Sequence, residues 1–425
     1  MKVKKLALKT YRNIEGCEFH PDPGLNFLLG ANGQGKTSFL EALGYLATLR
    51  SFRGAKAPEV ILRGHESADI HCELYSDSPG SLDWKTELRV FFQMTDVVAK
   101  RAKKTAFVNG KPFHSSTQYL SQRFGNFELG FHTVIFNPSD HDLVRGDPAT
   151  RRGYLDQVLS AEDVEYLKTI QKYQRVLDQK NALLRSAEGM PTSDLRDILQ
   201  GFNEQLVELA AKIAFARISW LQRLAPTADD VMRKIAPLQQ PLQAFYVSSW
   251  APNFEGLSLG NDKLDSIHFA GQSAPASLEL LEQVFWTKLS TLESAEWRTG
   301  HSLVGPHRDD WSFFLGGEPL KGYGSQGEVR SALLALKLSE MELFLNQTGH
   351  RPLFLLDDFS SELDRDRRSF LLRFLEETDL QVFVTTTENN FSSGRRFYVS
   401  NGNLFDAPPL GASVAPNADA PSALL

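Results

Sequence analysis

The chain has 425 residues, 42% hydrophobic and 23% charged, which is typical of a globular protein with two or three domains. A net charge of −6 argues against a broadly basic nucleic-acid binder, although a local basic face can act within an acidic whole. No apolar run approaches the length of a membrane span, so no membrane partner is expected. Cys17 and Cys72 are the two cysteines; they suit a reducing cytoplasm better than a disulfide or zinc site.

The first 43 residues predict strands, a glycine-rich loop and a helix. Residues 2–10 alternate between apolar and polar side chains, which predicts an edge strand, and residues 16–19 predict a returning strand. Residues 25–29 indicate a buried strand and residues 38–43 a helix. Between them, a segment fits the pattern G-x-x-x-x-G-K-[ST] at every fixed position: Gly30, Ala31, Asn32, Gly33, Gln34, Gly35, Lys36 and Thr37.

That pattern predicts a nucleotide site, because its glycines let successive N–H groups wrap a phosphate at the positive end of a helix. We expect Lys36 to reach the β- and γ-phosphates of ATP and the Thr37 hydroxyl to bind Mg²⁺. Ser38 follows in the helix and joins the nucleotide-binding candidates. The alternative is that Lys36 and Thr37 are ordinary residues at a helix N-terminus; the flanking strand and helix disfavour it.

Further strands are expected at residues 68–75, 88–93 and 105–108, and Asn109-Gly110 is a strong hairpin signal. A dense run of cations lies nearby: Lys100, Arg101, Lys103 and Lys104, with Lys111 beyond the turn. One interpretation is contact with DNA phosphates, and the other is a solvated hairpin edge protected by lysines. Arg145, Arg151 and Arg152 are a weaker basic candidate.

Helical spacing dominates from about residue 148 to 224 without a sustained heptad, which predicts a short helical arm. Residues 242–318 show strand and helix fragments. A helix at 328–345, another near 365–376 and a strand at 380–384 follow. We therefore expect an ATPase head from residues 1–135 and 296–405, an arm domain at 136–295, and a disordered tail at 406–425.

The apolar run 352–356 ends in Asp357 and Asp358, the form of a Walker B strand. We expect Asp357 to hold Mg²⁺, mostly through water, and Asp358 to orient or deprotonate the attacking water. Upstream, Ser325 and Gly327 form either a plain helix cap or a signature that binds the γ-phosphate held by another subunit. Residues 362–364 resemble a D-loop. This order predicts an α/β fold: an ABC-type P-loop ATPase head of mixed sheets with an inserted, mainly helical arm.

The chain resembles the RecF family of SMC-like ABC ATPases over nearly its whole length. The likeness rests on the segments 6–13, 30–42, 51–53, 136–140, 146–156, 303–310 and 385–387. The resemblance implies a weak ATPase in which hydrolysis acts as a timer, an ATP-dependent homodimer, and binding to gapped or duplex DNA without sequence preference. It also implies RecR, RecO and RecA as partners, with RecA loading as the outcome, and a phosphate contact for Arg12.

Several alternatives stay open. The signature ends in Glu328 where the family commonly has Gln, which affects contact with a partner-bound nucleotide. One of Thr385–Thr387 is a candidate γ-phosphate sensor, and Asn137 or Asp140 a candidate metal sensor, but local structure explains all of them equally well. His307 is interpreted as structural. The rival functions are the ATPase subunit of a non-DNA ABC machine and an SMC-like structural tether.

Overall fold

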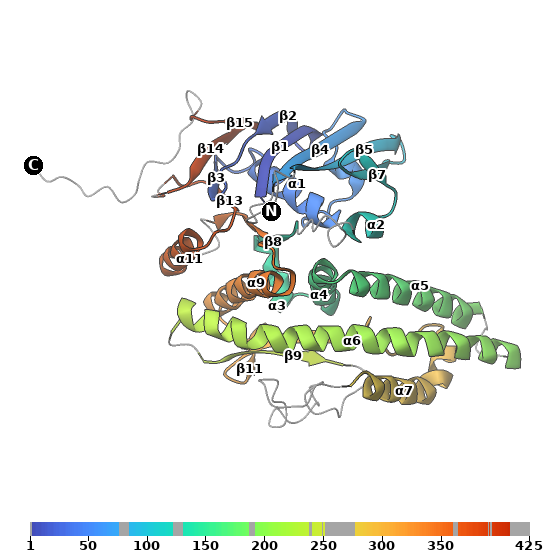
Figure 1. The fold of residues 1–425 in the computed structure, drawn as a ribbon. Coiled ribbons are helices and arrows are strands. Elements are labelled where there is room, and N and C mark those ends of the chain that lie inside the picture. The colour runs from blue at the N-terminus through green and yellow to red at the C-terminus, as the bar shows by residue number, and fades with distance from the viewer. Residues whose placement is uncertain are drawn as a thin grey trace, which may run out of the picture. The chain divides into compact units, whose positions relative to one another are not determined.

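The computed structural model describes residues 2–75, 85–121, 131–186, 192–237, 240–248, 250, 277–359, 364–389, 391 and 393–408. These residues divide into two compact units (Figure 1). The discontinuous unit combines Met1–Ser139 with the chain from Phe344 onward, and the middle unit is Asp140–Leu343. Residues 362 and 363 of the expected D-loop (362–364) and residues 409–425 of the expected disordered tail lie outside the described residues.

The discontinuous unit contains one antiparallel and one mainly parallel sheet. The antiparallel sheet has the order β2-β1-β4-β5-β6-β7: β1 (Lys2–Tyr11), β2 (Ile14–Phe19), β4 (Ser67–Tyr75), β5 (Lys85–Asp96), β6 (Arg101–Val108) and β7 (Lys111–Phe113). The other sheet has the order β15-β14-β3-β13-β12-β8, antiparallel only at β15: β3 (Leu25–Leu29), β8 (Thr133–Phe136), β12 (Leu353–Leu356), β13 (Val382–Thr386), β14 (Arg395–Ser400) and β15 (Asn403–Phe405).

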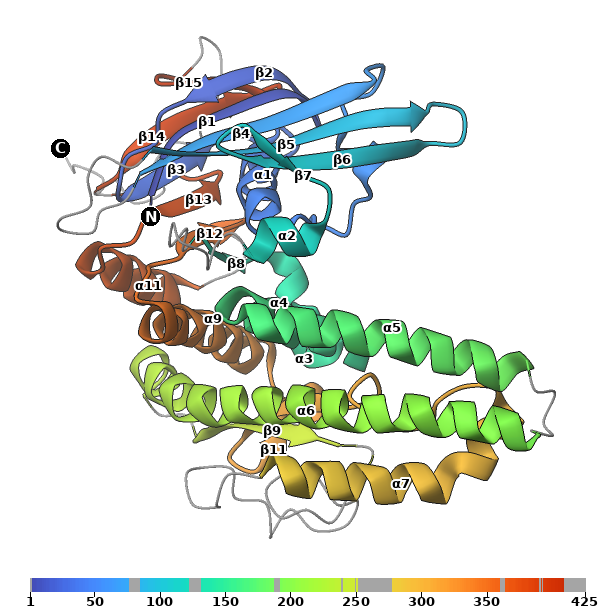
Figure 2. The ribbon, with the colours of Figure 1, turned by 45° about the vertical axis from the view of Figure 1, so that its right-hand side comes forward.

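Helix α1 (Lys36–Thr48) lies within the core of this unit. Residues 38–47 of this helix are all buried, so it is enclosed on every face. Phe39, Leu40, Leu43 and Leu46 pack in one cluster with residues of both sheets. Figure 2 shows α1 beside the strands β4 and β5. The remaining short elements are α2 (Ser116–Ser121), α11 (Arg365–Glu377) and the 3-10 turns Ala57–Val60 and Pro138–His141.

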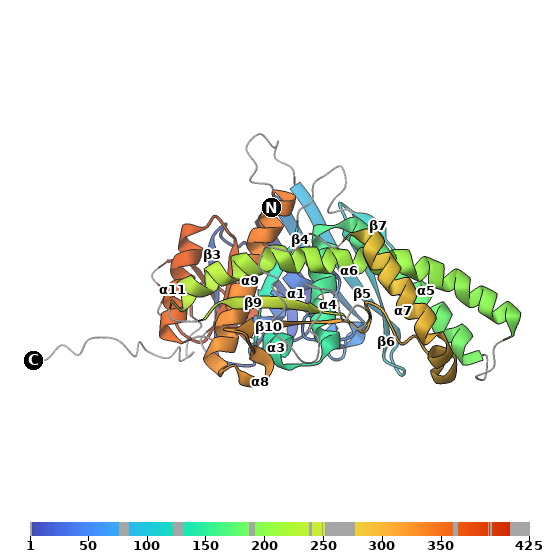
Figure 3. The ribbon, with the colours of Figure 1, turned by 90° about the horizontal axis from the view of Figure 1, so that it is seen from below.

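The middle unit is mainly helical, with a small antiparallel sheet of order β11-β10-β9. The strands are β9 (Leu242–Val247), β10 (Asp310–Leu315) and β11 (Glu318–Pro319). The helices are α3 (Asp142–Arg145), α4 (Pro148–Glu162), α5 (Val164–Ser186), α6 (Ser193–Ile235), α7 (Leu278–Thr299), α8 (Leu320–Tyr323) and α9 (Gln326–Thr348). Helices α5 and α7 both pack against α6, and the three overlap in the view of Figure 3. No helix in the described ranges is long and apolar enough to cross a bilayer.

The expected fold class is confirmed, with three local differences. Strand β1 is not an edge strand, because it pairs with both β2 and β4. Helix α6 is one helix of 43 residues that continues through Pro226 to Ile235, whereas helical spacing alone indicated an end near Leu224. Residues 296–343 fall in the middle unit, and not with the head as expected, because α8 and β10 pack against α3 and α4.

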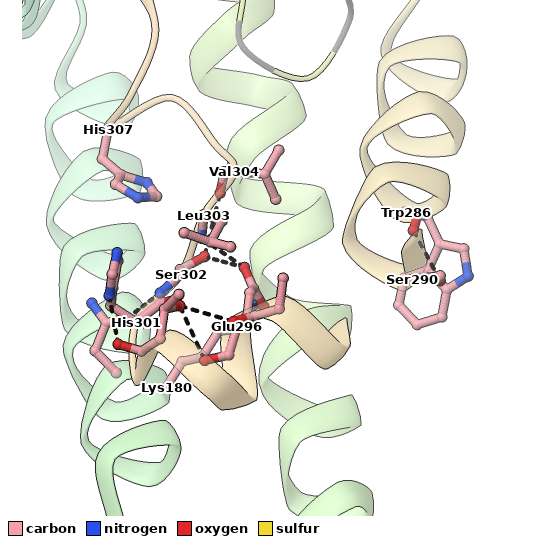
Figure 4. Close-up of polar contacts among 12 residues, drawn as sticks. Lys180, Trp286, Ser290, Glu296, His301, Ser302, Leu303, Val304 and His307 are labelled. Carbon is pink, nitrogen blue, oxygen red and sulfur yellow. Dashed lines mark hydrogen bonds and ion pairs between the residues drawn. The ribbon is translucent and has the colours of Figure 1, made fainter. Parts of the chain in front are cut away.

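A buried ion pair joins α5 to α7. Lys180 Nζ lies 2.7 Å from Glu296 Oε2, and both side chains are almost completely buried. The other oxygen, Glu296 Oε1, accepts hydrogen bonds from the Ser302 hydroxyl (2.8 Å) and the Leu303 N–H (2.9 Å). Figure 4 shows these groups around one carboxylate. Burial lowers the pKa of Lys180, and the nearby Glu296 carboxylate opposes that shift. Glu296 therefore fixes the segment that leads to residues 305–310.

Residues 305–310 are held by side chains from α4, α5 and α6. The bonds run from Arg151 to the Asp310 carboxylate (2.7 and 2.8 Å), from Arg152 to Asp309 O (2.8 Å), from Arg217 to Pro306 O (2.8 Å), and between Tyr173 Oη and His307 Nδ1 (2.7 Å). Burial lowers the pKa of His307 to about 4, which favours its structural interpretation. Two segments that resemble the RecF family, 146–156 and 303–310, thus form one polar network.

Removal of Glu296 should destabilise the protein more than removal of Lys180. Glu296→Ala leaves a buried ammonium, a hydroxyl and an N–H without their shared acceptor, whereas Lys180→Met leaves a carboxylate that keeps two donors. We expect Glu296→Ala to cost roughly 3–5 kcal/mol of unfolding free energy, the range for breaking a buried ion pair. Urea unfolding measures both variants. Equal losses, or a larger loss in Lys180→Met, would contradict the role of Glu296 as the common acceptor.

Candidate functional site

A cleft of about 610 Å³ in the discontinuous unit brings the expected nucleotide site together. Its volume is in the range of small-molecule sites. It is lined by Arg12, Asn13, Asn32, Gly33, Gly35, Lys36, Thr37, Ser38, Arg53, Glu59, Ile61, Arg63, Pro138, Asp357, Asp358 and Thr385. The glycine-rich loop therefore shares one cleft with both Walker B carboxylates, which lie more than 300 residues away in the sequence.

The loop from Gly30 to Gly35 has the backbone that its sequence predicts. Gly33 (φ 80°) and Gly35 (φ 107°) are left-handed, a conformation that favours glycine. A Cβ at Gly35 would also lie 2.6 Å from the Asn13 amide nitrogen. The adjacent Gln34 is fixed by the turn before β15, because its side-chain oxygen accepts from Asn401 N (2.7 Å) and its carbonyl from Gly402 N (2.9 Å). The loop thus lies between Asn13 on one side and the turn before β15 on the other.

Lys36 begins α1 and is largely buried. Its Nζ donates to the carbonyl oxygens of Gly30 (2.5 Å) and Ala31 (2.9 Å). Burial lowers the pKa of Lys36, while Asp358 and Asp357 act in the opposite direction. The ammonium is therefore a concentrated charge at the N-terminus of a buried helix, where backbone N–H groups already favour an anion.

Asp357 is the point where three segments meet. Its Oδ1 accepts hydrogen bonds from the hydroxyls of Thr37 (2.9 Å) and Thr385 (2.7 Å). The sheet order explains this, because β3, β13 and β12 are parallel neighbours whose carboxyl ends lie at the same edge. Burial raises the pKa of Asp357, and the two hydroxyls oppose that shift. Hard oxygen donors thus converge beside Lys36, as Mg²⁺ requires.

Asp358 differs from its neighbour in backbone and exposure. It has φ 54° and is half-buried, whereas Asp357 is 7% exposed. Its N–H donates to Thr385 Oγ1 (2.9 Å), so Thr385 bonds to both aspartates. Left-handed backbone at a non-glycine residue is strained and is often found at functional sites. The two carboxylates therefore lie side by side in the cleft but in distinct environments.

Arg12 lines the cleft and is held there by the buried Glu41, to which the sequence analysis had assigned no function. Glu41 is completely buried in α1 and accepts from Arg12 Nε (2.7 Å) and Nη2 (2.5 Å) and from the Ser51 hydroxyl (2.5 Å). Arg53 Nη1 is 3.7 Å from the same carboxylate. The segments 40–42 and 51–53 that resemble the RecF family are thus parts of one network. In the sequence, one acidic residue among the apolar residues 39–47 could have indicated a buried, paired carboxylate.

The candidate signature begins α9 in the middle unit. Ser325 N donates to Glu328 Oε2 (2.8 Å), and Glu328 N donates to Ser325 Oγ (3.2 Å). This is a reciprocal capping box, a motif that accepts Glu or Gln in the last position. Glu328 therefore preserves the capping geometry while adding a negative charge at the helix start. Ser325 is exposed, so its side chain is accessible on the surface of this unit.

The basic run divides between two faces of β6. Lys104 points inward, where its Nζ donates to Leu49 O (2.5 Å) and lies 5.4 Å from the Tyr45 ring centre, and burial lowers its pKa. Lys100, Arg101 and Lys103 are exposed. The expectation that all four form one surface is therefore corrected. Strand alternation explains the division, because successive side chains point to opposite faces.

The other open candidates also have clear positions. Arg151 is 2% exposed and ion-paired, and Arg152 donates to a carbonyl, so neither provides a free basic surface. Asn137 accepts from Ser139 N (2.8 Å), and Asp140 is 3.4 Å from Lys337. Among the expected sensors in the described chain, Thr385 is the one that lines the cleft. Asn13 and Arg63 also line the cleft. Asn13 lies in the segment 6–13 that resembles the RecF family, whereas no motif in the sequence pointed to Arg63.

Comparison with known proteins agrees with these features. The model of the RecF/RecN/SMC N terminal domain family matches residues 2–399. DNA replication and repair protein RecF of Symbiobacterium thermophilum is 34% identical over 388 residues, 91% of this chain and 92% of the relative. The same protein of Roseiflexus castenholzii is 32% identical over 417 residues, 96% and 100% of the two chains.

Solved structures give the same result. The structure of the recombination mediator protein RecF-ATP in the RecFOR pathway has a TM-score of 0.79 and 27% identity, and the match covers 95% of this chain and 96% of that one. An Smc head domain from Pyrococcus furiosus, at 12% identity and a TM-score of 0.51, shares the fold. The chain therefore belongs to the RecF/RecN/SMC N terminal domain family and, within it, to the RecF proteins.

Proposed function

We propose that this RecF protein is a weak ATPase that dimerises on ATP, binds gapped or duplex DNA without sequence preference, and promotes RecA loading with RecR and RecO. The observation that carries the ATP-dependent part is the convergence of Lys36, Thr37, Asp357 and Asp358 in one cleft. The DNA-repair part rests on relatives named for DNA replication and repair and on a solved RecF-ATP structure of the RecFOR pathway.

The residues of the cleft suit distinct roles. The backbone N–H groups of residues 33–37 bind phosphate oxygens, and Lys36 neutralises the β- and γ-phosphates. Thr37 and Asp357 hold Mg²⁺, directly or through water. When bound, that ion neutralises charge that develops on the phosphates. Asp358 is half-buried and less enclosed than Asp357, so it is the carboxylate placed to orient or deprotonate a water.

The signature completes the site from a second copy of the chain. The N–H groups of Gln326 and Gly327, in the first turn of α9, have no acceptor within that helix and therefore suit an anion. In a symmetric dimer, each signature would face the nucleotide of the partner. ATP binding then closes the dimer and hydrolysis opens it, so ATP sets how long the protein stays on DNA. Aspartate at position 358, one methylene shorter than glutamate, is consistent with slow turnover.

The DNA contact is assigned to the turn between β5 and β6. Lys100 lies in this turn, and Arg101 and Lys103 lie at the start of β6; all three are exposed. Val97 and Val98, in the same turn, are 62% and 95% exposed. Asp96 pairs in register with Arg101 and carries one negative charge, so the three cations still give this end of the hairpin a net positive charge. Cations at such a tip bind phosphates without reading bases. A non-DNA ABC machine or a structural tether explains neither this tip nor the RecF relatives.

Lys36→Ala should abolish ATP binding and preserve the fold. The change removes the charge that neutralises the β- and γ-phosphates but no contact of the buried core beyond two carbonyl oxygens. Titration with a fluorescent ATP analogue measures affinity, and circular dichroism checks the fold. Ser121→Ala, on the distant helix α2, serves as a control. Undiminished nucleotide affinity in Lys36→Ala would rule out the phosphate-loop assignment.

Asp358→Asn should retain ATP binding, lose hydrolysis and accumulate the closed dimer. The amide keeps the size of the side chain but cannot accept a proton from water. Steady-state phosphate release and light scattering with ATP measure the two effects. If this variant hydrolyses ATP at the parent rate, the water is activated by another group. Asp357→Asn is the matched comparison: it should weaken Mg²⁺-dependent binding itself.

DNA binding should weaken steeply with salt, because phosphate contacts release counterions at a slope of roughly −0.9 per phosphate on duplex DNA. Neutralising Lys100, Arg101 and Lys103 together should flatten that slope and leave ATP-driven dimerisation unchanged. Fluorescence anisotropy with ATP at several salt concentrations measures it. Lys104→Gln is the control, since Lys104 faces the interior. An unchanged slope in the triple variant would move the DNA-binding face elsewhere.

A further inference from the structure

Helix α8, which directly precedes the signature, packs against the short helix α3, and each of the two helices ends at a glycine. Helix α3 ends at Arg145, and Gly146 N donates back to Asp142 O (2.9 Å). Helix α8 ends at Tyr323, and Gly324 N donates back to Leu320 O (3.1 Å). A Cβ would lie 2.5 Å from Asp142 O at position 146, and 2.9 Å from Leu320 O at position 324. Neither position has room for a side chain without a shift.

A cationic side chain from each helix donates a hydrogen bond to the glycine that ends the other helix. Arg145 Nη2, from α3, donates to Gly324 O (3.1 Å), and Lys321 Nζ, from α8, donates to Gly146 O (3.1 Å). Each cation therefore bonds the carbonyl at the end of the opposite helix, where the helix dipole favours positive charge. We call this reciprocal pair of bonds the signature clamp. Its two bonds lie on the surface, so nearby solvent weakens each of them.

One side of the clamp is anchored in the interior. Gly146 O accepts a second bond from Arg151 Nη1 (2.8 Å), and Arg151 is 2% exposed. The same guanidinium forms a two-bond ion pair with Asp310 at the start of β10. Such a bidentate pair fixes orientation as well as distance. Gly146 is therefore a rigid reference point against which Lys321 and Arg145 hold α8.

The other side of the clamp reaches the signature directly. Gly324 immediately precedes Ser325, the residue that caps α9. We propose that Arg145 and Lys321 are positioning residues that fix the signature for the nucleotide held by a second copy of this chain. This inference rests on the proposed ATP-dependent dimer. Neither side chain needs to touch the nucleotide; each acts through the backbone of residues 321–325.

The position of the cleft makes the inference testable. Arg145 and Lys321 belong to the middle unit, whereas the residues that bind ATP within one copy belong to the discontinuous unit. A change in the clamp should therefore leave the ATP affinity of the monomer unchanged and weaken dimerisation. A symmetric dimer contains two signature clamps, so a modest loss of interaction free energy at each signature is doubled in the dimerisation free energy.

The experiment uses the full-length protein with a slowly hydrolysed ATP analogue. Light scattering gives the protein concentration at half-dimerisation, and a fluorescent analogue gives monomer affinity. Arg145→Ala should raise the half-dimerisation concentration about tenfold, equivalent to about 1.4 kcal/mol per dimer. Lys321→Ala should act in the same direction. Arg145→Lys should largely restore dimerisation because it keeps a cation within reach of Gly324 O.

Three controls separate the possible outcomes. Arg175→Ala removes an exposed arginine of α5 and should dimerise like the parent. Ser325→Arg places a bulky cation at the signature itself and should block dimerisation. If Ser325→Arg blocks it while Arg145→Ala does not, the clamp has no positioning role and the proposed dimer stands. If Ser325→Arg also dimerises normally, the signature does not meet the partner's nucleotide and the clamp proposal fails. If the parent protein does not dimerise with the analogue, the proposed dimer itself fails.

A further measurement addresses DNA. If Arg145→Ala dimerises normally but loses DNA affinity, Arg145 is a phosphate contact and the positioning role is overturned. Urea unfolding of Arg145→Ala should match the parent, since the side chain is exposed. If Arg145→Ala unfolds, the inference is decided by Arg145→Lys and Lys321→Ala. Normal dimerisation in Lys321→Ala would then overturn it.

Discussion

One buried aspartate, Asp357, connects four segments of the discontinuous unit. Asp357 Oδ1 receives hydroxyl groups from the start of α1 and the end of β13, and its own N–H donates to Phe136 O at the end of β8. Four segments, between residues 37 and 385, are therefore joined at one residue, two of them through its side chain. A buried carboxylate is costly unless it is satisfied by hydrogen bonds. That cost means that the segments must arrive together for the site to form.

In the middle unit, buried ion pairs connect separate segments of the chain. Arg151, Arg217, Lys180, Asp156, Glu296 and Asp309 are all largely buried or paired within it, and their bonds connect α4–α7 to residues 302–310. Asp309 Oδ2, for example, accepts from both Tyr246 Oη (2.8 Å) and Trp250 Nε1 (2.9 Å). A fully satisfied polar network specifies one arrangement more sharply than apolar packing does. Such networks explain why these segments are recognisable in sequence even though they lie outside the ATP cleft.

The sequence predicted which residues share the cleft better than it predicted the details of the framework. Gly30–Thr37, Asp357 and Asp358 could be identified because local backbone and phosphate chemistry restrict the residue types at each position. Their common cleft followed from parallel strands ending at one edge. By contrast, the contacts of Glu41 with Arg12 and of Thr385 with Asp357 belong to no local sequence motif. The inward direction of Lys104 depends on strand register. The continuation of α6 through Pro226 was hidden because proline normally ends a helix, and only packing against α5 and α7 reveals otherwise.

The division of the chain has a consequence for how the protein is made. Strand β3, which leads into the phosphate loop, pairs with β13 and β14, whose residues follow it by more than 350 positions. During synthesis, the five buried residues of β3 leave the ribosome long before either neighbour exists. The middle unit, by contrast, is continuous and completes earlier. A nascent chain therefore carries an unpaired apolar strand until its last tenth is translated, so chaperone occupancy should concentrate on its first 140 residues. A product truncated before β13 lacks Thr385 and the strand beside β3, and so lacks part of the nucleotide cleft.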